Sequence, residues 1–166
     1  MIKRRTADHG IDRIDARLLA LVQEDAERTS QQLARLAGTS PSSVQRRLRA
    51  LRASGVIERV TAQVAPEKVG RPFLAVVEVI MEREDVATIH DFKRRMRATP
   101  EVMHCFHVTG EYTFALIVNL RDMADFGPFA ERLFGANRGI QRIRTSVVIS
   151  RVKSNATIQI DGSEPH

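Results

Sequence analysis

The stretch from Ser40 to Leu51, SPSSVQRRLRAL, decides how the first third of this 166-residue chain folds. Ser40 is a typical helix N-cap, and Pro41 suits the first turn because its missing N–H would find no partner there. Apolar residues then recur at the spacing of one helix face, which predicts a buried stripe: Val44, Leu48 and Leu51. Gly55 is expected to end the helix. The opposite face begins with short polar side chains and continues with arginines.

Two shorter helices are predicted before this one. The first, of about eleven residues, starts near Asp12 as its cap and buries a stripe at near-helical spacing, formed by Ile11, Ile14, Leu18 and Leu21/Val22. The second starts with Ser30 as its cap and should turn three residues inward: Leu33, Leu36 and Ala37. Gly38 ends it by adopting a left-handed conformation. The tight turn 38–40 between the second and third helices is the arrangement of a helix-turn-helix, whose second helix enters the major groove of DNA.

The positive charge of the chain is concentrated in the same region. Residues 1–60 hold twelve basic and seven acidic residues, whereas residues 61–166 hold fourteen and thirteen. Between Ser40 and Val60 five arginines accompany one acid, Glu58. Such clustering favours a polyanion, because phosphate contacts release condensed counterions. A solvated charged helix face is the alternative, and the helix-turn-helix spacing favours double-stranded DNA.

The segment after the third helix is predicted to connect two domains. Val60, Ala62 and Val64 alternate as in a short strand, which suits a wing or a tether beside the helices. Pro66 to Pro72 contains Gly70 and is typical of a hinge. The domains expected are therefore 1–62 for DNA binding, 63–72 as hinge, and 73–166.

The remainder alternates strand and helix patterns in the order β-α-β-β-α-β, the ferredoxin-like topology. The predicted elements are strand 73–82, helix 86–98, strand 102–108, strand 112–119, helix 123–134 and strand 140–152. The fold class is thus α+β. Both helices cover one face of such a sheet, so the apolar residues of the other face need cover, and a second copy of the chain is the simplest one.

No pattern in the sequence supports a catalytic, metal or cofactor site. In the run His104 to His107, strand alternation puts Cys105 and His107 on one face and His104 on the other, so the three cannot share a metal without a bulge. Cys105 lacks an adjacent resolving cysteine and is interpreted as a packing residue. The longest apolar runs have five residues, whereas a membrane span needs about 20. With no signal peptide pattern, a cytoplasmic, nucleoid-associated location is expected.

The turn 108–113 offers backbone N–H groups, two hydroxyls and the Tyr112 phenol at the head of two strands. It is interpreted either as a tight strand connection or as part of a small-ligand pocket near a subunit boundary.

Taken together, these motifs resemble the Lrp/AsnC (leucine-responsive, feast/famine) family of transcriptional regulators over residues 11–152. The resemblance rests on the order and spacing of six segments: 11–15 (IDRID), 40–48 (SPSSVQRRL), 55–57 (GVI), 66–70 (PEKVG), 108–112 (VTGEY) and 144–148 (RTSVV). It implies an N-terminal winged helix-turn-helix and a C-terminal ferredoxin-like effector-binding and oligomerisation domain. It also implies dimers, often higher homo-oligomers such as octamers, and an amino acid or related metabolite as effector.

The resemblance and the helix face together assign candidate residues. Those for DNA are Ser40, Ser42, Ser43, Gln45, Arg46, Arg47 and Arg49, the last from the face argument alone. Those for the effector are Thr109, Gly110, Tyr112, Thr113, Met123, Ser146, Val147 and Val148. Where many members have aspartate after the tyrosine, this chain has Thr113, which removes an anion able to pair with a ligand ammonium.

Three functions compete at this point. The first is a DNA-binding regulator, repressor or activator, in which Ser42, Ser43 and Gln45 read bases and Arg46, Arg47 and Arg49 hold phosphates or a guanine. The second is a ligand sensor that has lost DNA binding. The third is an enzyme like the sirohaem decarboxylases that resemble this family, with His104 and His107 near a tetrapyrrole.

Overall fold

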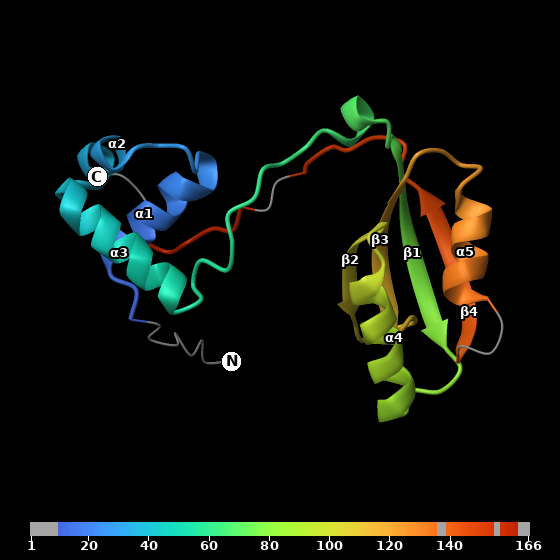
Figure 1. Ribbon diagram of the computed structural model, residues 1–166. Helices are drawn as coiled ribbons and strands as arrows, with labels where there is room; N and C mark the ends of the chain where they lie inside the picture. Colours follow the sequence, from blue (N-terminus) through green and yellow to red (C-terminus); the bar gives the residue numbers. More distant parts are fainter. Residues whose placement is uncertain (1–9, 136–138, 155–156, 163–166) are drawn as a thin grey trace. The chain divides into compact units, whose positions relative to one another are not determined.

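The chain folds into two compact units, which a computed structural model describes over residues 10–135, 139–154 and 157–162 (Figure 1). The first unit comprises residues up to Ala62 together with the segment from Ser154 onward, and the second runs from Gln63 to Lys153. The described end of the chain therefore belongs to the first unit, whereas the sequence pattern predicts it in the second.

The first unit holds helices α1 (Arg13–Glu24), α2 (Ser30–Ala37) and α3 (Pro41–Ala53). Asp12 and Asp15 form a capping box at the start of α1, in which each carboxylate accepts the backbone N–H of the other residue. Gly38 ends α2 at a φ of 66°, and Ser40 caps α3 by accepting the N–H of Ser43. All three helices predicted from the sequence are present, with α3 capped as predicted.

Two details of α2 differ from the prediction. Thr29 caps the helix, not Ser30, because Thr29 and Gln32 form a second capping box. Leu36 is 47% exposed, and Ala34 is buried in its place. Helix α2 therefore packs against the core through Leu33, Ala34 and Ala37.

The predicted wing is absent from the described residues: 56–65 contains no strand. A short 3-10 helix, η1 (Pro66–Val69), follows and ends at Gly70, whose φ is 71°. The alternation of Val60, Ala62 and Val64 is real, but no strand of the described residues pairs with it to satisfy its N–H and C=O groups.

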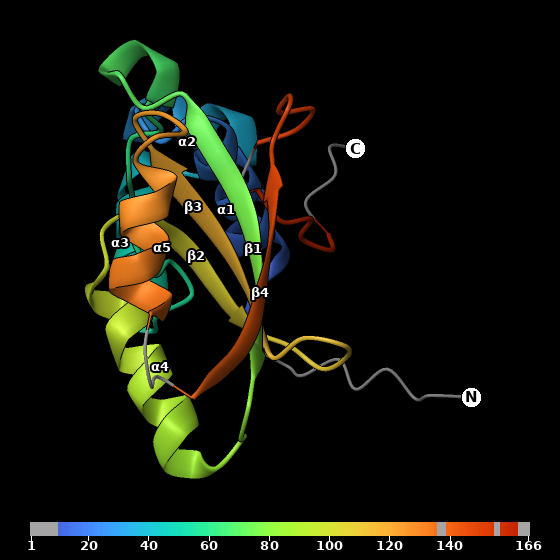
Figure 2. The ribbon, with the colours of Figure 1, turned by 90° about the vertical axis from the view of Figure 1, so that its right-hand side faces the viewer.

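The second unit is an antiparallel sheet with two helices on one face (Figure 2). Its elements are β1 (Phe73–Met81), α4 (Val86–Ala98), β2 (Val102–His107), β3 (Phe114–Leu120), α5 (Phe126–Phe134) and β4 (Ile140–Val147). The strand order is β2-β3-β1-β4, so the predicted βαββαβ ferredoxin-like α+β fold is confirmed. Strand β4 is shorter than predicted because its partner β1 begins at Phe73, and the N–H of Val148 makes the last bond, to the carbonyl of Leu74.

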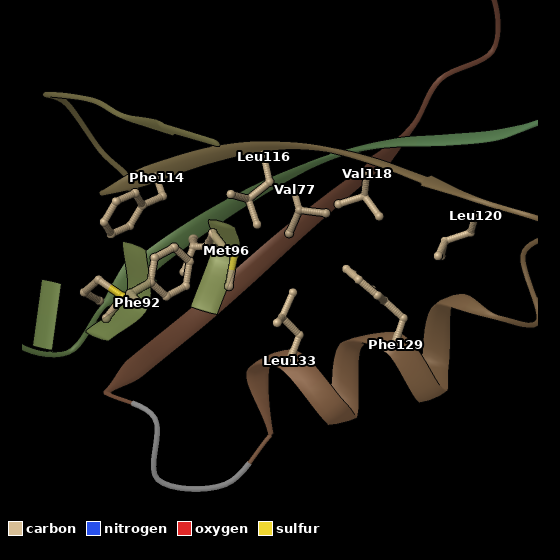
Figure 3. Packing of buried hydrophobic residues seen from close by; sticks show 11 residues of the cluster. Val77, Phe92, Met96, Phe114, Leu116, Val118, Leu120, Phe129 and Leu133 are labelled. Carbon is tan, nitrogen blue, oxygen red and sulfur yellow. The ribbon is translucent and has the colours of Figure 1, made fainter. Parts of the chain in front are cut away.

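The core of the second unit lies between the sheet and its helices (Figure 3). Val77, Leu116 and Val118 point from the strands toward Phe92 and Met96 of α4 and toward Phe129 and Leu133 of α5. The rings of Phe92 and Phe114 are stacked with centroids 4.3 Å apart, and both side chains are fully buried. This layer fixes the sheet, and within the described residues of the second unit no helix covers the other face.

Candidate nucleic-acid interface and effector surface

Helix α3 has one buried side and one exposed side, as the sequence predicts. Its buried residues are Val44, Leu48 and Leu51. The exposed residues are Ser40, Ser42, Gln45, Arg46 and Arg49, with Ser43 half-buried. Short side chains at the first turn let a helix end approach base edges closely, and longer cations behind it reach the phosphates. In the described part of the chain no carboxylate forms an ion pair with Arg46 or Arg49.

Arg47 does not belong to this exposed face. Its Nη1 donates to Asp12 Oδ2 at 2.6 Å and to Asp15 Oδ1 at 2.9 Å, so it joins α3 to the start of α1. The Asp15 N–H lowers the pKa of Asp12, Arg47 lowers it further, and hydrogen bonds to Asp15 and Asp12 raise the pKa of Arg47. That Arg47 holds a phosphate stays a prediction; in this structure its guanidinium positions α3 against α1. Its i+3 spacing from Val44 gave the signal that it lies beside the buried stripe.

We expect Arg47→Ala to destabilise the first unit by about 1–2 kcal/mol, because Asp15 would remain largely buried without its partner. Part of this difference should vanish in acid. Since the pKa of Asp12 is lowered in the folded state, its stabilisation is present above its ordinary value of 3.8 and is lost as pH falls through the folded value. Thermal unfolding followed by the helical circular dichroism signal measures both, with the exposed Arg52→Ala as control. Equal stability of the two variants at neutral pH would contradict the role of Arg47.

The candidate effector residues lie at two opposite ends of the sheet. Residues 109–113 connect β2 to β3, next to the pair Val79 and Phe114. Met123 follows β3 and residues 146–148 end β4, beside the start of β1. Strand β3 separates the two ends by about 20 Å at 3.4 Å per residue. One chain therefore does not bring these residues together.

Thr113 is buried and its hydroxyl is already in use. The Thr113 Oγ1 donates to Glu84 Oε1 at 2.8 Å and accepts the N–H of Met81 at 3.2 Å. A direct contact of Thr113 with the effector stays a prediction; in this structure its hydroxyl supports the turn. The same bond holds the carboxylate of Glu84, an exposed residue, beside Thr113, which stands where many members of the resembled family have an aspartate. Sequence reasoning missed Glu84 because it comes from a different loop.

The run His104 to His107 alternates as predicted. His104 stacks on Phe106, and His107 stacks on Phe114, which faces the core. Burial raises the pKa of the Cys105 thiol, so the thiol stays protonated and packs against the core. Within the described residues no group of three or more His, Cys, Asp or Glu side chains could hold a metal ion. No helix in that part of the chain is long and apolar enough to span a membrane.

Comparison with known proteins agrees with this geometry. Residues 11–52 match the model of the AsnC-type helix-turn-helix domain, and residues 74–158 match that of the Lrp/AsnC ligand binding domain. An uncharacterised HTH-type transcriptional regulator of Sinorhizobium fredii is 42% identical over 91% of this chain and 89% of its own. Relatives with assigned roles in Bacillus subtilis and Escherichia coli are named as transcriptional regulators, which favours a regulator over the sirohaem decarboxylase alternative.

Two solved structures share the whole two-unit plan. A transcriptional regulator of Neisseria meningitidis in complex with L-methionine has 29% identity and a TM-score of 0.82, covering 89% of this chain and 95% of that one. The feast or famine regulatory protein of M. tuberculosis, complexed with L-methionine, has 29% identity and a TM-score of 0.79, covering 89% and 98%. The two matching models together cover most of the chain, which therefore belongs to the Lrp/AsnC family of DNA-binding transcriptional regulators.

Proposed function

We propose that the exposed face of α3 reads a specific double-stranded DNA sequence and that a small metabolite modulates this binding. The observation that carries the proposal is the division of α3 into a buried apolar stripe and an exposed face of serines, a glutamine and two arginines that form no ion pair with any described residue. Ser42, Ser43 and Gln45 contact bases, while Arg46 and Arg49 hold phosphates. Ser40 acts through its cap of the helix. Function on DNA places the protein at the nucleoid, in the cytoplasm.

The experiment is fluorescence anisotropy with the duplex upstream of the protein's own gene and with a scrambled duplex, over a salt series. Tighter binding to the upstream duplex with a steep salt dependence supports the proposal. Equal and weak binding to both duplexes would contradict it and would favour a sensor that has lost DNA binding.

We further propose that the effector is an amino acid, bound where residues 109–112 of one chain meet Met123 and residues 146–148 of another. The separation of the two sets within one chain supports a site that two copies complete. The Glu84 carboxylate beside Thr113 supplies an anion that suits an ammonium group. Both L-methionine complexes among the solved relatives agree with this class of ligand. L-methionine in the anisotropy assay, with other amino acids beside it, tests the class.

The uncovered face of the sheet is proposed to pair with a second copy, as a homodimer that assembles further, for example into an octamer. Register places Val76 of β1, Ile117 of β3 and Phe106 of β2 on this face, where Phe106 is 53% exposed. Burying such residues is the usual basis of a stable homodimer interface.

We expect Ile117→Asp to convert the assembly to monomers, because the interface would bury an unpaired carboxylate. Sedimentation velocity measures the change. The matched control is Val86→Asp, since Val86 is 86% exposed on the helix side. A dimer of unchanged stability in Ile117→Asp would place the interface elsewhere.

A further inference from the structure

The last described segment of the chain, residues 157–162, docks on the first unit through a pair of hydrogen bonds. The Gln23 Nε2 donates to the carbonyl of Ile158 at 3.1 Å, and the N–H of Ile158 donates to Gln23 Oε1 at 2.8 Å. One side-chain amide thus satisfies both backbone groups of a single residue, as a neighbouring strand would. The docking is therefore specific to this register of the segment.

Ile160 adds an apolar contact two residues further on. Its side chain is half-buried and packs against the core of the first unit, the cluster that includes Leu18 and Leu21 of α1. Gln159, between the two isoleucines, is exposed. Ile158 is itself 73% exposed, so the segment is held by the backbone of Ile158 and by the side chain of Ile160.

The chain leaves the second unit at a fixed point before it reaches this site. After β4, the Val148 N–H is bonded to the carbonyl of Leu74, and Arg151 Nη2 lies 2.8 Å from Glu67 Oε2 of η1. The segment that follows β4, residues 148–151, is thus held against η1 and the start of β1. The first unit is joined to the second by two covalent connections, near residue 62 and near residue 154, and not by one.

We propose that residues 157–162 form a strap that couples the end of β4 to the DNA-binding unit, an inference that rests on the proposed function. Residues 146–148, part of the candidate effector surface, begin this connection. From Val148 to Ile158 the chain has roughly ten residues and reaches at most about 35 Å, so a shift of the β4 end acts on a short tether. An effector that shifts the end of β4 would change the fraction of molecules in which the strap is docked. Docking in turn would change the affinity of the DNA-binding unit for DNA.

Amide hydrogen exchange on the intact protein tests the docking. In the wild type the Ile158 amide should exchange at least about tenfold more slowly than an unstructured amide, and the last turn of α1 should be protected with it. Ile160→Asp should abolish this protection and speed exchange in α1, with the sheet of the second unit unchanged. Gln159→Asp carries the same charge on the exposed side and should leave exchange as it is. An unprotected Ile158 amide in the wild type overturns the strap.

DNA affinity tests the coupling, in the same two variants and in a chain that ends after Lys153. The face of α3 is intact in all of them. We expect the Ile160→Asp and shortened proteins to bind the upstream duplex at least about threefold more weakly than Gln159→Asp, because the DNA-binding units are oriented less narrowly. Lost protection with unchanged DNA affinity overturns the coupling. A wild type that does not distinguish the duplexes contradicts the proposed function instead, and the exchange result stands apart from it.

Discussion

Loss of duplex affinity on every sequence is the expected result for the double variant Arg46→Ala/Arg49→Ala. The two guanidiniums lie on the exposed side of α3, and no carboxylate of the described residues is paired with them. Each phosphate contact contributes about 0.9 to the magnitude of the negative slope of log affinity against log salt, so the slope should become shallower by about 2. The affinity at low salt should fall by roughly ten- to a hundredfold. Anisotropy with the upstream and scrambled duplexes measures both.

The control removes the same charge from another place. Arg83 and Arg97 are exposed cations of the second unit, so Arg83→Ala/Arg97→Ala lowers the net charge equally without touching α3. If only the long-range electrostatic field of the protein mattered, both double variants would lose the same DNA affinity. An unchanged salt slope in Arg46→Ala/Arg49→Ala would remove this helix face from the DNA interface.

The second large effect is expected from Phe92→Ala, in the middle of the second unit. Phe92 is fully buried between α4 and the sheet and stacks on Phe114 at 4.3 Å. Its removal deletes a stacked pair and leaves a cavity, so the free energy of unfolding should fall by about 3–5 kcal/mol. The chain has one tyrosine and no tryptophan, and Tyr112 lies in this unit. Tyrosine fluorescence during denaturant unfolding therefore reports the affected unit.

Val86→Ala serves as the control, since Val86 is 86% exposed on the same helix and should cost less than about 0.5 kcal/mol. If Phe92→Ala and Val86→Ala unfold at the same denaturant concentration, the packing of α4 on the sheet is not as described.

The elements that local chemistry specifies could be predicted from the sequence. The cap by Ser40, the stripe of Val44, Leu48 and Leu51 and the range of α4 are as expected, because caps and periodicity act within a few residues. The strand expected around Val60 and the inward position of Leu36 were wrong. Both depend on neighbours distant in sequence, since a strand needs a partner and a helix face is chosen by what packs on it.

The candidate site shows the same division between local and distant information. The exposed face of α3 followed from spacing alone, whereas the role of Arg47 depends on Asp12 and Asp15, more than thirty positions earlier. The contact of Glu84 with Thr113 and the docking of Ile158 on Gln23 likewise join residues that are distant in sequence. No periodic pattern predicts either contact. That Tyr112 and Met123 lie at opposite ends of the sheet can be seen only once the strand register is known.

Glu78 and Arg144 face each other across β1 and β4 on the uncovered side of the sheet, with Oε2 and Nη1 3.9 Å apart. If a second copy covers that side, both charges leave water together, and each can tolerate burial only beside the other. A related regulator that carried one charge without its opposite would leave a lone ion in the shared layer. In such an assembly the pair would favour self-association over mixing with a chain that lacks one of the two charges.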